Sequence, residues 1–183
     1  LNNNFGGLYL EYSNFSKVHN NTLNENFAAG IYLYYSNSST VTNNSCDQNS
    51  LLGISVFTGL DNIISWNSLV KNGFYGISIS STSNNNSIHH NTFINNGETF
   101  SLEIQAKDDG INNYWDDTSN NEGNYWSDYN GTGSYPIDGD AGAVDPYPLN
   151  QPTITEFNSN LILISTLILG LFGLIVYLRR LCP

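Results

Sequence analysis

Apolar and polar residues alternate in short runs that recur at a fixed distance along the chain. Each run is an apolar–polar–apolar triplet that follows a glycine, as in Ile31-Tyr32-Leu33 and Ile54-Ser55-Val56. Four glycines spaced by 23 residues mark these units: Gly7, Gly30, Gly53 and Gly76. Alternation with a period of two predicts short β-strands rather than helices, and a fixed period of this length is typical of repeat proteins.

Further columns keep the same register within the repeat. One apolar column comprises Val18, Val41, Ile64 and, one residue late, Ile88; another comprises Leu23, Cys46, Leu69 and Phe93. Two asparagine columns comprise Asn21, Asn44, Asn67 and Asn91, and Asn26, Asn49, Asn72 and Asn96. We expect these amides to stack and to hydrogen-bond from unit to unit. We also expect these asparagines to adopt the left-handed backbone of sharp bends.

The fold that fits this pattern is all-β: a right-handed parallel β-helix of about five 23-residue coils over residues 1–107, with the fifth coil at 100–104. A leucine-rich repeat would need its spaced leucines, and a propeller blade would need four strands and roughly 40 residues. The period stops near residue 108. Segment 108–149, rich in aromatic and Asp residues, is expected to cover the last coil as a cap, because an open sheet end invites pairing with other chains.

The C-terminal part changes character again. Residues 150–160 form a polar linker, and residues 161–178 are uncharged and long enough for a transmembrane helix. Arg179 and Arg180 begin a tail, 179–183, that the positive-inside rule places in the cytoplasm. We therefore expect a single-pass protein of the cell membrane with its β-helix outside.

Composition narrows the choice of partners. The net charge is −11, and five Lys and Arg residues are too few for a nucleic-acid surface. The chain contains no Met and opens inside a repeat, so we expect it to be the C-terminal part of a longer protein. Cys46 lies in an apolar column and is expected to be a buried hydrophobic residue rather than a functional thiol.

Several residues are candidates for binding. Tyr9 and Tyr32 occupy the same outward position on adjacent coils and should stack, either to bind sugar rings or only to stabilise the sheet. Trp115 and Trp126 of the cap could form a second carbohydrate platform, or simply a lid over the core. Asp138, Asp140 and Asp145 could hold Ca²⁺, or could simply form turns. Candidate glycosylation sequons begin at Asn14, Asn20, Asn37, Asn43, Asn85 and Asn130.

The asparagine-rich coils followed by GNYWSDY (123–129) and a YPI…DPYPL ending resemble the NosD-type right-handed β-helix proteins, which are common on archaeal cell surfaces. The resemblance implies a role in copper delivery, with wider relatives that bind or cleave carbohydrates. Copper prefers His, Cys or Met ligands, and the imidazoles here are His19, His89 and His90. His19 and His89 are expected three coils apart, and His89 and His90 on opposite faces of a strand. These histidines are therefore expected to be ordinary turn or surface residues.

The favoured interpretation is a membrane-anchored, non-catalytic β-helix that binds surface glycans or neighbouring proteins. One alternative is a carbohydrate-active enzyme, resembling a lyase, epimerase or glycosidase, with its site partly upstream of residue 1. Another is a NosD-like copper-handling protein. Three lysines scattered over the coils do not form the cationic cluster that proton abstraction beside a carboxylate needs, which disfavours the enzyme.

Overall fold

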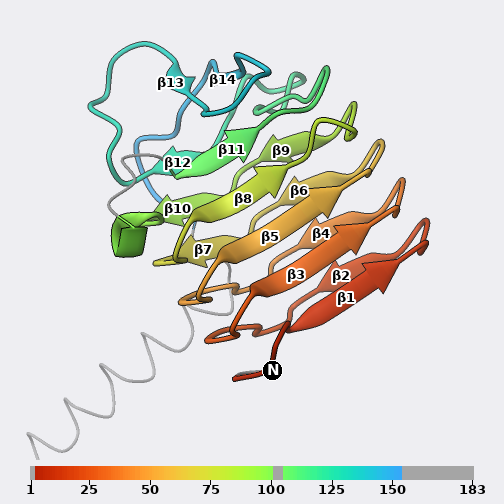
Figure 1. Cartoon of the computed structure of the whole chain (residues 1–183). Helices are drawn as coiled ribbons and strands as arrows, with labels where there is room; N and C mark the ends of the chain where they lie inside the picture. The colour runs from red at the N-terminus through yellow and green to blue at the C-terminus, as the bar shows by residue number, and fades with distance from the viewer. Residues whose placement is uncertain (1–2, 101–104, 154–183) are drawn as a thin grey trace, which may run out of the picture. The chain divides into compact units, whose positions relative to one another are not determined.

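The coils stack into a parallel β-helix, with like positions of successive units lying one above the other (Figure 1). The computed structural model describes residues 3–100 and 105–153. The first sheet has the order β1-β3-β5-β8-β11 and comprises Leu8–Glu11, Ala29–Tyr34, Leu52–Phe57, Tyr75–Ile79 and Ala106–Asp108. The second has the order β2-β4-β6-β9 and comprises Lys17–His19, Thr40–Thr42, Ile63–Ser65 and Ser87–His89. The third has the order β7-β10-β12 and comprises Ser68–Val70, Thr92–Ile94 and Tyr125–Trp126.

The register of the sheets confirms the repeat. Ile31 pairs with Ile54, and Ile54 with Ile77, in parallel. Ile64 pairs with Ile88, which is the late residue of its column. Matching letters of the repeat are therefore neighbours in space.

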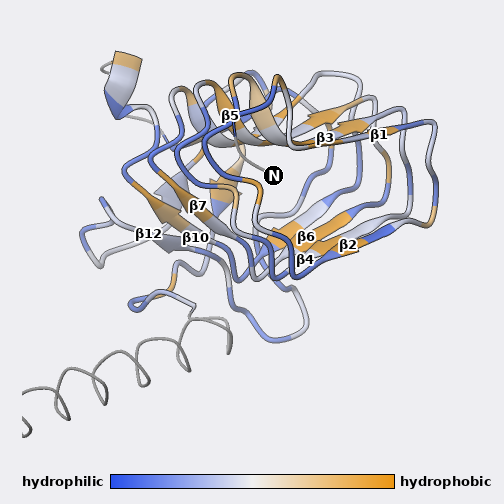
Figure 2. Ribbon diagram, turned by 90° about the horizontal axis from the view of Figure 1, so that it is seen from below, coloured by the Kyte–Doolittle hydropathy of each residue, from blue (hydrophilic) through white to orange (hydrophobic). Residues whose placement is uncertain are grey.

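The core fills the space between the three sheets. The inward-facing side chains of the triplets are buried, apart from the half-buried Leu8 and Leu10 of the first coil, and so are the second and third apolar columns. Cys46 is among them, as predicted, and its burial raises the pKa of the thiol well above the usual value. Figure 2, coloured by hydropathy, shows hydrophobic strands in all three sheets joined by mainly hydrophilic corners.

The fifth coil differs from the prediction. Glu98–Phe100 forms a 3-10 helix, and residues 101–104 lie outside the described part of the chain. The strand that continues the first sheet is β11, in which Ala106 pairs with Ile77. The solenoid has about four turns rather than five, because an insertion delays β11 and the cap then replaces further coils.

The asparagine ladders form as predicted. Asn44 Nδ2 donates to Asn67 Oδ1 at 3.0 Å, and Asn67 Nδ2 donates to Asn91 Oδ1 at 2.9 Å. The same pattern joins Asn26, Asn49, Asn72 and Asn96. A third ladder, which the repeat columns did not reveal, runs from Asn62 through Asn86 to Asn113.

The left-handed corners do not fall on the ladder asparagines. They fall on the residue just before them, such as Asn43 with a φ of 55° and Gln48 with a φ of 56°. The ladder side chain must point inward to reach its neighbours, whereas the residue before it turns the chain outward. Two adjacent residues therefore divide these roles: the first forms the bend, and the second joins the amide ladder.

The cap ends in a short antiparallel pair, β13 (Tyr135–Pro136) and β14 (Val144–Asp145). None of the helices in the described residues is long and apolar enough to cross a membrane. The predicted span 161–178 and tail 179–183, together with most of the predicted linker 150–160, lie outside the described residues.

Replacing one ladder amide should destabilise the protein. Asn67 is 1% exposed; its Oδ1 accepts from Asn44, and its Nδ2 donates to Val41 O and Asn91 Oδ1. Asn67→Ala leaves these groups without partners in the core, so we expect the free energy of unfolding to fall by about 2–4 kcal/mol. Urea denaturation followed by circular dichroism measures this loss.

The matched control is Asn43→Gly, at an exposed asparagine whose left-handed backbone glycine tolerates. It should change the free energy of unfolding by no more than about 0.5 kcal/mol. Equal losses in the two variants would show that the amide ladder does not stabilise the fold.

Candidate metal site

The predicted tyrosine pair lies on the outward face of the first sheet. Tyr9 and Tyr32 are register partners, and their ring centroids are 5.7 Å apart. The rings are tilted by 53° rather than stacked; Tyr9 stacks instead on Tyr34, with centroids 6.0 Å apart at 28°. Side-by-side placement is thus confirmed, while the expected face-to-face stack between the two is wrong.

The two tryptophans of the cap are buried. Trp115 and Trp126 are each 1% exposed and pack on Phe93 at the end of the core. Their indole N–H groups donate to buried carboxylates, Trp115 to Asp108 at 2.9 Å and Trp126 to Asp145 at 2.8 Å. Neither ring offers a face to a sugar, so the structure supports the lid rather than the platform.

The three aspartates predicted for Ca²⁺ do not converge. Asp145 is 0% exposed and accepts hydrogen bonds from Trp126 and from the backbone N–H groups of Asn124 and Tyr147. Asp138 lies instead beside Lys107 of the first sheet, and the Asp140 backbone N–H donates to Asp109. Among the described residues, these three carboxylates form no cluster that could hold an ion.

The sequon asparagines lie at the surface. Asn37 is half-buried, and the other five are exposed: Asn14, Asn20, Asn43, Asn85 and Asn130. Their attachment atoms are therefore reachable, and glycosylation stays a prediction.

A pair of histidines at the end of β9 forms a different cluster. β9 ends at His89, and His90 follows with a left-handed φ of 55°. This corner breaks the alternation of a strand, so the two rings lie on the same side rather than on opposite faces as predicted. The placement of His19 three coils away is confirmed, because Thr42 and Ser65 separate it from His89 along the sheet.

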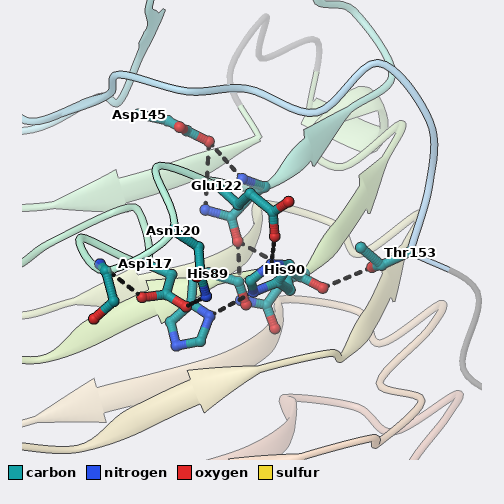
Figure 3. A network of polar contacts seen from close by, with 10 residues as sticks. His89, His90, Asp117, Asn120, Glu122, Asp145 and Thr153 are labelled. Carbon is teal, nitrogen blue, oxygen red and sulfur yellow. Dashed lines mark hydrogen bonds and ion pairs between the residues drawn. The ribbon is translucent and has the colours of Figure 1, made fainter.

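Three potential ligand atoms meet at this corner. The Nδ1 atoms of His89 and His90 are 2.7 Å apart, a distance at which one carries a proton and the other accepts it. Asp117, from the loop after β11, lies beside His89 (Figure 3). The ligand atoms of the three residues all lie within 4.8 Å of one another, and residues 3–100 and 105–153 contain no other such group of His, Cys, Asp and Glu.

Neighbouring groups hold His90 in place. Glu122 Oε2 lies 2.7 Å from His90 Nε2, while the Trp66 indole stacks on the ring with centroids 4.3 Å apart at 3°. Thr153 Oγ1 donates to the His90 carbonyl oxygen at 2.6 Å. A carboxylate on the far nitrogen of a histidine fixes the tautomer and orients the ring, which is the usual arrangement around a metal-binding imidazole.

The protonation states favour ligation near neutral pH. A carboxylate of Glu122 accepts from Nε2 of His90, so Nδ1 is the ring nitrogen that faces His89. Partial burial lowers the pKa of His89, and His90 lowers it further, against an opposing effect of Asp117. Hydrogen bonds from Ser119 N–H and the Asn120 amide lower the pKa of Asp117. A metal ion bound to both imidazoles would displace the proton that lies between the Nδ1 atoms.

The donor set suits a divalent transition-metal ion. Two imidazole nitrogens and one carboxylate oxygen are ligands that Cu²⁺, Ni²⁺ and Zn²⁺ accept. Two neighbouring ligands at a right angle, each about 2.0 Å from an ion, lie about 2.8 Å apart. The observed 2.7 Å between the Nδ1 atoms is close to this spacing, and an ion that replaces the shared proton would need the two rings to turn until both lone pairs face it.

Sequence reasoning missed this site because it treated His90 as a strand residue. The signal was present in the repeat: Asn20, Asn43, Trp66 and His90 occupy one column, and all four have a positive φ. At a left-handed corner the side chains no longer point alternately to opposite faces as they do in a strand. The side chain of the corner residue can therefore turn toward that of the strand residue before it.

Comparison with known proteins gives one match. A family model described as periplasmic copper-binding protein (NosD) matches residues 1–131. No curated protein and no solved structure matches significantly.

The lowered pKa of His89 predicts pH-dependent stability. Its folded-state pKa lies below the ordinary value of 6.5, so the unfolded chain binds more protons and acidification favours unfolding. Between pH 7.5 and 5.5 the free energy of unfolding should fall, and His89→Gln should reduce the fall. Urea denaturation at each pH measures both slopes.

His19→Gln is the control, since it removes an exposed imidazole of the same sheet column. Burial raises the pKa of three carboxyls, those of Asp47, Asp116 and Asp145. Their protonation on acidification favours the folded state, which opposes the effect of His89, so each variant is compared with the parent at the same pH. A slope that His89→Gln leaves unchanged would contradict the assignment.

Proposed function

Because the chain belongs to the NosD family of periplasmic copper-binding proteins, we propose that it binds a copper(II) ion at His89 and His90, with Asp117 as a third ligand. The observation that carries the proposal is the convergence of two Nδ1 atoms at 2.7 Å, with a carboxylate on the far nitrogen of His90. Copper is here the cargo that the protein holds, not a cofactor of a reaction.

The oxidation state follows from the ligand types. Copper(I) is held best by thiolate and thioether sulfur, whereas copper(II) accepts nitrogen and oxygen ligands. The chain contains no Met, Cys46 is sealed in the core, and Cys182 lies outside the described residues. The nitrogen and oxygen donors of this corner therefore favour the oxidised ion.

The position of the site suits uptake and release. His89 and Asp117 are half-buried, and the Glu122 side chain is 52% exposed, so an ion can reach the ligands from solvent. Three protein ligands leave at least one position of a four-coordinate ion free for water or for a ligand from another protein. An ion bound in this way can be passed on, which is consistent with copper handling.

Copper titration tests the proposal directly. Trp66 stacks on His90, one of the proposed ligands, whereas Trp115 and Trp126 are buried in the core. We expect Cu²⁺ to quench the fluorescence of Trp66 with saturation at one equivalent, and His89→Gln to weaken binding at least tenfold. In Trp66→Phe the saturable quenching should weaken while calorimetry still detects binding.

His19→Gln serves as the matched control, because it removes the equivalent imidazole three coils away. It should leave the affinity unchanged. Equal loss in the His19 and His89 variants, or quenching that never saturates, would mean that copper binds only nonspecifically.

Glu122 should act on copper through His90 rather than directly. Glu122→Gln replaces the acceptor of the His90 Nε2 proton, so the affinity for Cu²⁺ should fall by about 10–100-fold. Glu98→Gln, at an exposed acid of the 3-10 helix, is the control. An unchanged affinity in Glu122→Gln would remove this carboxylate from the site.

Attachment to a membrane is the second element of the proposal. Residues 161–178 lack charge, and Arg179 and Arg180 follow them, which supports an anchor with the β-helix outside. We expect the chain to sediment with membranes after alkaline carbonate washing, and a chain ending at residue 160 to stay in the supernatant. Release of both forms by carbonate would contradict the anchor.

A further inference from the structure

The cap contains a cavity that the copper site does not use. Its volume is about 490 Å³, within the range of about 300–1,000 Å³ typical of small-molecule sites. Residues from the loop between β12 and β13, and from the segment after β13, line it, among them Asp128, Tyr129, Asn130, Ser134, Tyr135 and Asp138. The cavity therefore combines aromatic rings with carboxylate, amide and hydroxyl groups.

Asp138, one of the lining residues, is joined to the edge of the first sheet. Asp138 pairs with Lys107, which places it at the end of the outward column that begins with Tyr9 and Tyr32. Its backbone is fixed by hydrogen bonds with Ala106 and Asp108. Its Oδ2 accepts from Tyr75 Oη at 3.4 Å, while its Oδ1 accepts nothing from the described residues. A rigid carboxylate with a free acceptor atom thus lines the cavity.

Two tyrosines also line the cavity. The Tyr135 ring stacks on Trp126 with centroids 4.1 Å apart at 8°, and its hydroxyl donates to Asp128 Oδ2 at 3.0 Å. Gln105 holds the other oxygen of Asp128 at 2.5 Å. Tyr129 closes the loop by donating to the Gly133 carbonyl oxygen at 2.6 Å, and its ring is half-buried. These hydrogen bonds preorganise the lining residues before any ligand arrives.

Charge excludes one class of ligand. Asp128 and Asp138 are acidic, and the nearby cation Lys107 is already paired with Asp109 at 2.7 Å. An anionic ligand would meet two carboxylates, and none of the described residues that line the cavity is positively charged. A neutral molecule with many hydroxyl groups could instead donate to Asp138 Oδ1 and lay its C–H face against Tyr129.

We propose that this cavity binds a neutral sugar residue, with Asp138 accepting from its hydroxyl groups and Tyr129 packing against its ring. The site is independent of the copper site, because it lies beside the first sheet whereas the histidines end a strand of the second sheet. It is a binding site and not an active site, since the proposal assigns no bond-breaking step to its residues.

Saturation-transfer NMR and calorimetry on the full chain in detergent, with EDTA present and Asn130 unglycosylated, test the proposal. The probes are methyl glycosides of glucose, galactose and mannose, N-acetylglucosamine and galacturonate. We expect at least one neutral sugar to bind saturably and galacturonate to bind at least tenfold more weakly. Asp138→Asn and Tyr129→Ala should each weaken binding at least tenfold.

Two controls separate this result from misfolding and from the copper site. Asp140→Asn removes a neighbouring exposed acid outside the cavity and should bind sugar like the parent, as should His89→Gln. Tyr129→Phe keeps the ring and should retain most of the affinity. The proposal is overturned if no neutral sugar binds, if galacturonate binds equally well, or if Asp138→Asn and Asp140→Asn behave alike.

Discussion

Each side-chain amide buried between coils needs a donor for its oxygen atom and an acceptor for its N–H groups. In this protein the amide-to-amide hydrogen bonds of every ladder run in the same direction along the stack. Each ladder amide donates its Nδ2 proton to the Oδ1 atom of the next coil toward the C-terminus, as Asn67 does to Asn91. Such a chain of bonds cannot end on another amide, because the last N–H group would then be buried without a partner. It has to end on a group that only accepts.

The cap supplies that group three times. One ladder passes from Asn91 to Asn124, whose Nδ2 donates to the Ile88 and Trp115 carbonyl oxygens and lies 3.5 Å from Asp145, while its backbone N–H donates to Asp145 at 2.7 Å. A second passes from Asn96 through Gln105 to Asp128, and the third passes from Asn113 to Asp108. Two of these carboxylates also accept the indole protons of Trp115 and Trp126, which close the apolar core beside them. The paired sequences NYW at 113–115 and 124–126 thus each provide a ladder amide and a core lid, two positions apart.

How much of this could be predicted depends on whether a feature repeats. The strands, their register and two of the three ladders follow from columns that recur every 23 residues, and Cys46 could be assigned to the core from its column alone. The cap could not be derived in this way, because Asp145 and Trp126 each occur once and their roles depend on contacts across the chain. A buried acid that ends a ladder looks in sequence like an acid in a turn, which is why Asp145 was grouped with possible calcium ligands.

The histidine pair is intermediate between the features that the repeat predicts and those that it does not. Its column repeats, but the residue type changes along it from asparagine to tryptophan to histidine, while the left-handed corner is kept at Asn43, Trp66 and His90 alike. The stack of Trp66 on His90 is therefore the ordinary neighbour contact of two coils, made by unusual side chains. The backbone fixes where these rings lie, so a metal site could arise there through substitutions that leave the scaffold unaltered.

The single direction of the ladders also bears on how such a protein can change length. An internal coil receives its hydrogen bonds from one neighbour and passes equivalent ones to the other, so a duplicated unit would enter the stack without leaving a mismatched amide. The cap carboxylates would still accept the last hydrogen bonds of the ladders from whichever coil comes last. Gene duplication could therefore lengthen the β-helix by whole units, carrying the histidine corner and the cap cavity together farther from the first coil.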